Sequence, residues 1–195
     1  MPRIRGDSIG EHHEMVWTGL AEAIGHLLRE RDYDAITMGH IAARAGLARN
    51  TLYNYARDKN ALVLALTQRA GRPTVERVAA IAARSHDPAA ERLREIIDVV
   101  LTAFTDQTLQ LMFRPDSVAA PKGSDSPFHE IVVEVENVVR EGIERGELRD
   151  VGDVPLTVEL LSGIMRAGAE RIGRDPGAFT GTARSAQEII LAALT

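Results

Sequence analysis

The stretch TMGHIAARAGLARNTLYNYARDK, residues 37–59, indicates the fold and its use better than any other part of the sequence. Its charged side chains are four cations and one acid, a net charge of +3, although the 195-residue chain has a formal net charge of -5. Residues 1–60 are balanced overall, so the acidic excess lies in the rest of the chain. A basic segment in an acidic chain predicts a head that binds an anion and a body with a different task.

The apolar spacing in and around this stretch predicts three helices. Between residues 17 and 28, apolar residues recur at intervals of three and four and form one stripe of a helix. Thr37 can then cap a short helix, and Gly46 stands where a helix C-terminus favours a left-handed residue. A second short helix is expected over about residues 48–55, with a further helix after it. Two short helices joined through a glycine form a helix-turn-helix pattern, whose second helix enters the major groove of DNA.

The exposed residues of this second helix, the recognition helix, have the chemistry that DNA requires. Arg49 can give two donors to guanine, and Asn50 and Asn54 have the paired donor and acceptor that suit adenine. Hydroxyl and ammonium donors nearby can hold backbone phosphates without reading the base sequence. The predicted phosphate-binding residues are Thr37, Thr51, Tyr53, Tyr55 and Lys59.

Several residues occur together at one specific spacing: Tyr33, Thr37, the IAxxAG of residues 41–46, the TLY of residues 51–53, and Lys59. With them, the segment YDAITMGHIAARAGLARNTLYNYARDKNALVLAL resembles the N-terminal DNA-binding domain of the TetR family of bacterial transcriptional regulators, and the resemblance spans roughly residues 17–70. The resemblance implies a homodimer, in which each subunit has three N-terminal helices for DNA and a larger helical domain for a small-molecule effector and for dimerisation. It also implies the same division between phosphate-binding and base-reading residues.

Three positions depart from the family's pattern. Asp32 replaces a common glycine, Ala48 replaces the serine or similar cap that opens the recognition helix, and Ala56 replaces an aromatic residue. Ala48 cannot accept a hydrogen bond from the helix N-terminus, so this helix is expected to start less firmly. Ala56 removes core volume between the recognition helix and the next one.

The rest of the sequence also predicts helices, so the expected fold class is all-α. Residues 1–60 are predicted to form the helix-turn-helix domain, and residues 61–195 a larger helical domain for effector binding and dimerisation. The motif GRP, residues 71–73, is expected to interrupt the chain. One apolar stripe over residues 93–112 predicts a single long helix, which the Pro115 that follows would end.

A valine-rich run after residue 128 raises the choice between helix and strand. Valine favours sheets, but the apolar spacing persists for about sixteen residues, which is too long for a typical strand. We therefore expect a helix that Gly146 closes. Ser126 and Pro127 are predicted to be its N-cap and first residue.

Two last helices are expected over about residues 155–172 and 182–194. Small residues on the first of them would let another helix approach closely. Pairing both helices with their copies in a second subunit would give a four-helix interface, although the same faces can also pack within one chain. The predicted dimer interface consists of Leu160, Gly163, Ile164, Ala167, Ala186, Ile190 and Ala193.

An effector pocket in this domain would be mainly aliphatic, because all three tyrosines and the tryptophan lie before residue 60. An apolar or amphipathic effector is therefore expected, and polar residues that interrupt apolar stripes could orient it. Each polar candidate also has an ordinary structural explanation, such as an ion pair between Arg166 and Glu170. The candidate effector-binding residues are Phe104, Gln107, Thr108, Met112, His129, Met165 and Arg166.

Other classes of protein find little support. The chain has no cysteine and therefore no disulfide framework or thiolate nucleophile, and its N-terminus lacks the apolar run of a signal peptide, as expected for a cytoplasmic protein without a membrane partner. The histidines of EHHE, residues 11–14, point about 100° apart on a helix, so no metal site and no cofactor is predicted. Arg3 and Arg5 could enter a minor groove or belong to a solvated tail.

The expected function is sequence-specific binding of a homodimer to a palindromic DNA operator, as a repressor that a small effector releases. A DNA-binding dimer without an effector is an alternative, because the C-terminal domain could serve only to dimerise. A small all-helical enzyme is a further alternative, but no spacing matches a nucleophile elbow, a phosphate loop or a metal-binding helix.

Overall fold

The structure is a computed structural model that describes residues 9–113 and 128–195, and over these ranges the chain is helical and contains no strand. The all-α fold predicted from the sequence is therefore confirmed. Within these ranges, three short 3-10 helices join the longer elements, namely η1 (Tyr33–Ala35), η2 (Leu111–Phe113) and η4 (Pro176–Ala178). The α-helices are α1 (Ile9–Glu30), α2 (Met38–Arg44), α3 (Arg49–Tyr53), α4 (Lys59–Ala82), α5 (Ala89–Ala103), α6 (Gln107–Gln110), α7 (His129–Glu144), α8 (Val154–Arg174) and α9 (Phe179–Leu194).

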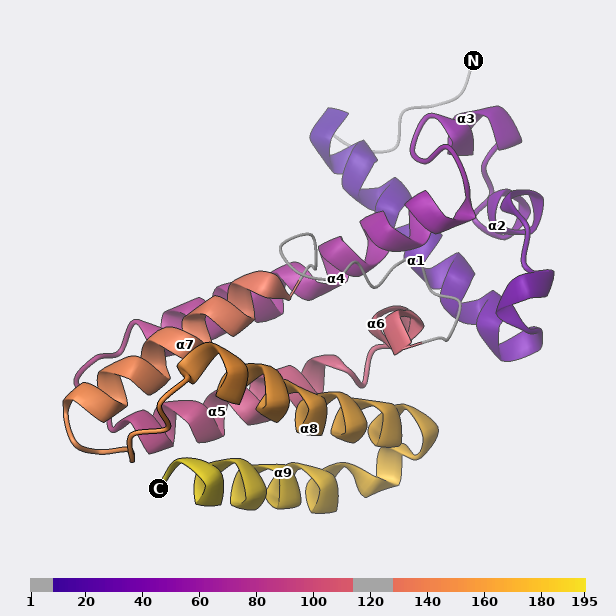
Figure 1. The fold of residues 1–195 in the computed structure, drawn as a ribbon. Coiled ribbons are helices and arrows are strands. Elements are labelled where there is room, and N and C mark those ends of the chain that lie inside the picture. The colour runs from indigo at the N-terminus through magenta and orange to yellow at the C-terminus, as the bar shows by residue number, and fades with distance from the viewer. Residues whose placement is uncertain (1–8, 114–127) are drawn as a thin grey trace.

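The helices are arranged in a small head and a longer body (Figure 1). Each of these two parts has its own core of buried apolar side chains. The head core joins α1, α2, α3 and the first half of α4, and Leu20, Ile41 and Leu52 are fully buried in it. The body core joins the second half of α4 with α5, α7, α8 and α9. The predicted arrangement of a three-helix N-terminal head and a larger helical C-terminal domain is thus present.

Helix α4 links the two cores without a break. The interruption predicted at the GRP motif is wrong, because α4 runs from Lys59 to Ala82 through Pro73. A proline in a helix interior removes one backbone hydrogen bond and costs about 3 kcal/mol. Burial of Val75 and Val78 against the body offsets this cost. Gly71 allows a close approach here, since a Cβ at this position would lie 3.3 Å from the ring of Phe128.

The single long helix predicted over residues 93–112 is also wrong. Helix α5 ends at Ala103, and the segment that follows it, from Gln107 to Phe113, is bent from it by 89°. The Asp106 side chain caps α6 by accepting a hydrogen bond from the backbone N–H of Thr108 at 2.6 Å. Capping by a short acidic side chain stabilises a new helix start, so the chain turns here and crosses toward the head.

The other predicted helices of the body are present, with small differences at their ends. Helix α7 is confirmed as a helix despite its valines, and Gly146 follows it with φ of +68°. Helices α8 and α9 extend slightly beyond the ranges predicted for them. The predicted N-cap and first helical residue, Ser126 and Pro127, lie outside the described residues.

A buried cation lies where α4, α5 and α7 meet. The side chain of Arg92 is 0% exposed, and its Nη1 donates to the Ala82 carbonyl and to Glu141 Oε2, both at 2.9 Å. Its Nε and Nη2 have no acceptor among the residues that the structure describes. An unsatisfied buried donor costs about 1 to 3 kcal/mol, so this guanidinium is a costly element of the core.

Replacing Arg92 with methionine is expected to raise the free energy of unfolding by about 2 kcal/mol, because a flexible apolar chain fills the site without orphaned donors. Urea denaturation measures this change, and Arg92→Ala serves as the control that leaves a cavity and lowers stability. An Arg92→Met variant that is less stable than the parent would show that the hydrogen bonds of Arg92 contribute more than its unsatisfied donors cost.

The same substitution should change the dependence of stability on pH. Hydrogen bonds from Arg92 and then Arg145 hold the pKa of Glu141 below its ordinary value of 4.5. A carboxylate with a lowered pKa stabilises the fold above its unfolded pKa, and this contribution is lost as the pH falls through the folded value. The acid limb of the stability curve should therefore be shallower in Arg92→Met than in the parent.

Candidate nucleic-acid interface and ligand cavity

The turn between α2 and α3 has the geometry of a helix-turn-helix. Gly46 adopts a left-handed φ of +68°, and the Leu47 N–H donates to the Ala42 carbonyl at 2.9 Å, as in a Schellman motif. At the start of α2, the Thr37 hydroxyl accepts from the backbone N–H of His40 at 3.2 Å, and His40 Nδ1 accepts from the Thr37 N–H at 3.3 Å. This reciprocal cap fixes the first helix of the motif.

The recognition helix α3 buries one face and exposes the residues predicted to read bases. Leu52 is fully buried in the head core, whereas Arg49, Asn50 and Asn54 are exposed. The guanidinium of Arg49 lies 5.8 Å from the centre of the Tyr53 ring, and its Nη2 is 3.4 Å from the hydroxyl of that residue. This weak contact orients the arginine along α3 and leaves its other donors for a partner.

The predicted phosphate-binding residues lie around α3 in different surroundings. Tyr53 is 42% exposed and Thr51 is half-buried. Tyr55 stacks on His13 of α1 with ring centres 5.1 Å apart. Lys59 Nζ donates to the backbone carbonyl of Tyr33 at 2.8 Å and lies 3.9 Å from the centre of the aromatic ring of the same residue. Lys59 therefore anchors the start of α4 to η1 in addition to its predicted role, while the Thr37 hydroxyl already caps α2.

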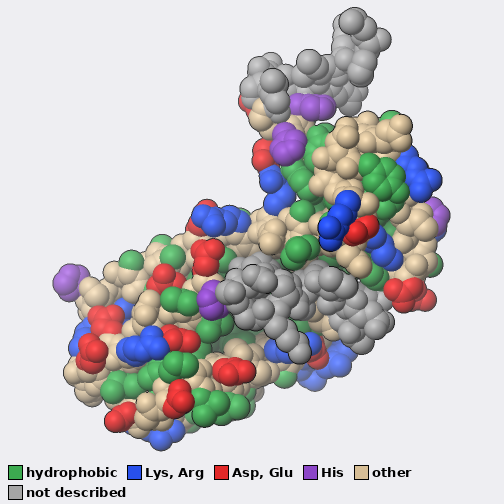
Figure 2. All heavy atoms as spheres, turned by 45° about the horizontal axis from the view of Figure 1, so that its top comes forward, with side chains coloured by type: hydrophobic (Ala, Val, Ile, Leu, Met, Phe, Trp, Pro, Cys, Tyr) green, Lys and Arg blue, Asp and Glu red, His purple; other side chains and the backbone are tan. Residues whose placement is uncertain are grey.

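The head is less basic than the net charge of +3 over residues 37–59 suggested, because two arginines of that segment are paired with acidic side chains. Arg44 Nη2 pairs with Glu30 Oε2 at 2.5 Å, and this hydrogen bond lowers the pKa of Glu30. Arg57 pairs with Asp58 at 3.3 Å. The body surface in Figure 2 carries acidic and basic side chains intermixed. Arg49 therefore differs from Arg44 and Arg57 because it lies on the exposed face of α3 and is not paired with a carboxylate among the described residues.

Ala48→Ser is expected to stabilise the head by about 1 kcal/mol. Ala48 is the N-cap of α3, has the extended backbone that suits a cap (φ -64°, ψ 142°) and makes no side-chain cap hydrogen bond. A serine hydroxyl there can accept from the free N–H groups of the first turn. Urea denaturation measures the gain in stability. Ala43→Ser is the control, because Ala43 is an exposed residue of α2 at which a serine supplies no cap. Equal effects of the two serines would contradict a capping role.

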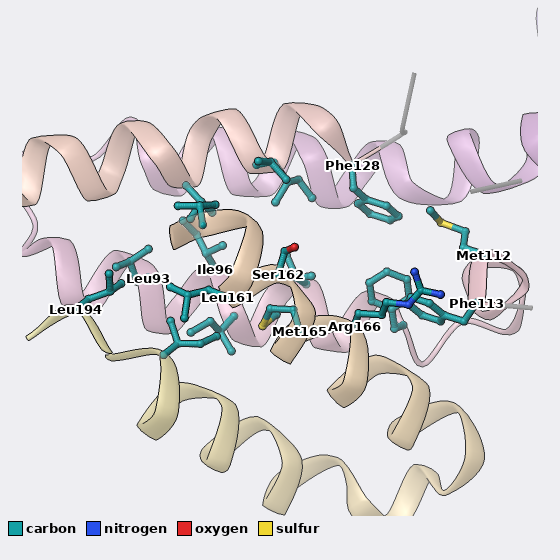
Figure 3. A pocket seen from close by; sticks show the side chains of 18 residues that line it. Leu93, Ile96, Met112, Phe113, Phe128, Leu161, Ser162, Met165, Arg166 and Leu194 are labelled. Carbon is teal, nitrogen blue, oxygen red and sulfur yellow. The ribbon is translucent and has the colours of Figure 1, made fainter. Parts of the chain in front are cut away.

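A cavity of about 200 Å³ lies in the body between α5, α7 and α8, with further wall residues from α9 and η2 (Figure 3). Four of the predicted effector-binding residues line it: Phe104, Met112, Met165 and Arg166. Its wall is apolar except for Ser162 and Arg166. The ring of Phe104 lies 4.9 Å from that of Phe113 and 5.3 Å from that of Phe128, measured between centres. The cavity can therefore accept an apolar molecule.

The other three predicted effector-binding residues do not line this cavity. Gln107 is exposed, and its Oε1 accepts from Arg29 Nη1 of the head at 2.8 Å. Thr108 is buried in α6, and His129 is half-buried at the start of α7. The sequence predicted that Gln107 and Thr108 lie on a helix that continues α5. The 89° bend after α5 instead directs the chain that contains them away from the cavity.

Several lining residues were not singled out from the sequence, and they are Leu93, Phe128, Leu161, Ser162 and Leu194. Apart from Ser162 they belong to ordinary apolar stripes of their helices. A stripe that packs fully and a stripe that leaves a gap have the same periodicity, so the sequence contained no signal that distinguishes them.

The outer face of α8 and α9 is apolar and exposed. Leu156 is 51% exposed and Leu160 is 67% exposed on α8, and Ile189 is 54% exposed on α9. Among the predicted interface residues, Gly163 and Ala167 are also exposed, whereas Ile164 and Ala193 are half-buried.

The predicted interface requires a correction on α9. Ala186 and Ile190 are 3% and 4% exposed within the single chain, so they are not a surface that a second subunit could cover. Ile190 faces the cavity instead. The apolar stripe predicted for α9 is present, but it packs inside the chain. Ile189, beside this stripe, is an exposed apolar residue of α9.

Within residues 9–113 and 128–195, no three histidine or carboxylate side chains lie close enough to hold a metal ion. No single helix of the described ranges has the length and apolar content to cross a membrane, although α5 and the bent segment after it pass by composition when taken together. The N-terminal Arg3 and Arg5 lie outside the described residues.

The geometry can be compared with known proteins. The sequence profile described as "Bacterial regulatory proteins, tetR family" matches residues 20–66, which include α2 and α3. Comparison with curated protein sequences gave no match.

Solved structures share the fold over nearly the whole chain. FadR from Bacillus subtilis in complex with stearoyl-CoA has a TM-score of 0.75 at 17% identity, covering 94% of this chain and 100% of that one. FadR from Thermus thermophilus, described as a TetR-family transcriptional repressor in complex with lauroyl-CoA, has a TM-score of 0.64 at 22% identity, covering 92% and 93%. SmeT, a repressor from Stenotrophomonas maltophilia, in complex with triclosan has a TM-score of 0.71 at 19% identity, covering 92% and 91%. The profile match shows that the N-terminal segment is similar to the tetR family of bacterial regulatory proteins, and the solved structures show that nearly the whole chain shares the fold of the regulators FadR and SmeT.

Proposed function

We propose that the protein is a homodimeric, sequence-specific transcriptional repressor of the cytoplasm that leaves a palindromic DNA operator when a small apolar or amphipathic effector binds. In this proposal residues 1–60 read DNA through α3, and residues 61–195 dimerise and bind the effector. The observation that carries it is the position of η2. Its first residue, Leu111, is buried in the head core, whereas Met112 and Phe113 line the cavity.

The short segment α6–η2 offers a route by which the cavity can influence the head. Gln107 of α6 accepts from Arg29 of α1 at 2.8 Å. Gln110 donates from Nε2 to the Ala169 carbonyl of α8 at 2.9 Å. A ligand that displaces Met112 or Phe113 would therefore move a segment that contacts both α1 and α8. Such a ligand shifts the population of head positions by no more than its differential affinity for them.

Dimerisation is proposed through the exposed stripe of α8. Leu156, Leu160, Gly163 and Ala167 follow one another at intervals of three or four residues, as expected for one face of a helix. Covering this stripe and Ile189 with their copies would remove exposed apolar area from water. A two-fold dimer would present two α3 helices to successive major grooves, about 34 Å apart, and so read a palindrome.

The class of effector is proposed from the cavity wall and from the relatives. The wall is almost entirely apolar. The FadR structures contain stearoyl-CoA and lauroyl-CoA, and the SmeT structure contains triclosan, and each of these ligands has a large apolar part. A DNA-binding dimer without an effector remains the second candidate, because the cavity is smaller than the roughly 300 to 1,000 Å³ of typical ligand pockets.

Fluorescence anisotropy with labelled duplex DNA tests the proposed DNA binding. The logarithm of the binding constant should fall steeply and linearly with the logarithm of salt concentration, by about 0.9 for each phosphate contacted. An effector should weaken operator binding by roughly 5- to 150-fold. Binding that is independent of salt, or equal on operator and random duplex, would contradict the proposal.

A further inference from the structure

The residues that line the cavity in the body extend along one helix. Its wall follows α5 from Leu93 to Phe104, a rise of roughly 16 Å at 1.5 Å per residue. Its volume is only about 200 Å³. A volume this small beside a wall of this length suits a single chain of atoms better than a fused ring system.

The two ends of the cavity differ in polarity. Figure 3 shows Leu93 and Leu194 at one end, and Arg166 with Phe113 at the other. The guanidinium carbon of Arg166 lies 5.6 Å from the centre of the Phe113 ring, so the cation borders the cavity wall. The other polar lining residue, Ser162, already donates its hydroxyl to the Glu159 carbonyl at 2.6 Å.

Arg166 retains the capacity to bind an anion. Its Nε donates to Glu170 Oε1 at 3.0 Å, which uses one of five N–H donors. The side chain is 60% exposed, so the charged end of the cavity is in contact with solvent. A guanidinium prefers planar anions such as carboxylate, which it can hold with two parallel hydrogen bonds.

We infer that the cavity binds an unbranched alkyl chain with an anionic head group, the head at Arg166 and the tail toward Leu93 and Leu194. This inference deepens the proposed function, since it names the class of effector for the same cavity. The length of the chain follows from the volume. An apolar cavity of about 150 Å³ holds one benzene molecule, so this cavity has room for about eight carbon atoms.

Isothermal titration calorimetry of the full chain with unbranched alkanoates, from butanoate to hexadecanoate, tests the inference. Affinity should rise about fourfold for each added methylene and reach its maximum near octanoate. Octanoate should bind about tenfold more tightly than octanol, and octylamine should bind more weakly than either. Octanoyl-CoA, titrated in parallel, distinguishes a free carboxylate from an uncharged thioester whose only anionic groups are the phosphates of CoA.

Three variants locate the head group. Arg166→Met keeps an apolar stem against Phe113 and should abolish the preference for octanoate while octanol binding stays the same. Glu170→Gln removes the competing carboxylate and should strengthen octanoate binding. Arg140→Met is the matched control, because it breaks a similar ion pair with Glu136 on α7 outside the cavity, and it should change neither ligand.

The outcomes separate this inference from the proposed function. Equal binding of octanoate and octanol, or an Arg166→Met variant that keeps the preference, overturns the anionic head. Tighter binding of hexadecanoate or of a fused-ring compound than of octanoate overturns the narrow single-chain site. If octanoate binds but operator DNA is not released, the effector role fails and the ligand assignment stands. If operator DNA binds specifically and no member of the series binds, the ligand assignment fails and the DNA-binding role stands.

Discussion

Leu160→Asp is expected to convert the proposed dimer to monomers and to lower affinity for operator DNA by at least about a hundredfold, or about 3 kcal/mol. Leu160 is 67% exposed at the centre of the apolar stripe on α8. A carboxylate there would have to be buried against its own copy across the two-fold axis, where like charges and lost solvation both disfavour association. A monomer can hold only one half-site, so it loses the contacts of the second head.

Light scattering coupled to size-exclusion chromatography measures the mass, and anisotropy measures the DNA affinity of the same sample. Val133→Asp is the matched control, because Val133 is a 41% exposed apolar residue on α7, a different helix from the one that carries the stripe. It should remain a dimer with unchanged DNA binding. A Leu160→Asp protein that stays dimeric would show that another surface joins the subunits.

Arg49→Ala is expected to weaken operator binding by about 1 to 3 kcal/mol and to relax the preference at one base position. Arg49 is exposed at the first turn of α3, and among the described residues its side chain contacts Tyr53 on the same helix. Its removal should therefore leave the head folded. Affinity for random duplex should change little, because a base contact contributes only where its base is present.

Two further variants define the contrast with phosphate binding. Lys59→Ala should weaken operator and random duplex alike, and its melting temperature must be measured as well, because Lys59 also anchors η1. Arg57→Ala removes a charge that is 88% exposed and paired with Asp58, so it should have the smaller effect. Equal losses on operator and random duplex for Arg49→Ala would show that this arginine does not read a base.

The sequence predicted the fold well where one physical signal dominated. Apolar residues at helical spacing identified α7 as a helix although it is rich in valine, and Gly46 was recognised because its left-handed turn suits glycine. The prediction failed where tertiary packing opposed a local preference. Pro73 ordinarily ends a helix, but α4 continues through it because both of its ends are buried in different cores.

The candidate sites differ in how far they could be predicted. The residues of α3 follow from a local pattern, so the sequence placed Arg49, Asn50 and Asn54 on an exposed face. The cavity depends on how four helices and η2 meet, and a periodic stripe does not reveal whether that meeting leaves a gap. The Asp106 cap that bends the chain after α5 moved Gln107 and Thr108 out of the predicted wall.

Selection of bound sequences from a random duplex pool by the purified protein tests whether the protein reads a palindromic site as a dimer. We expect enrichment of an inverted repeat, with half-site centres one helical turn or a multiple of it apart and two chains bound per duplex or a multiple of two. Substituting Arg49 should then relax one symmetric pair of positions in the enriched site. Failure of folded protein to enrich any sequence at low salt, or enrichment of a single unrepeated half-site by a monomer, would contradict this expectation.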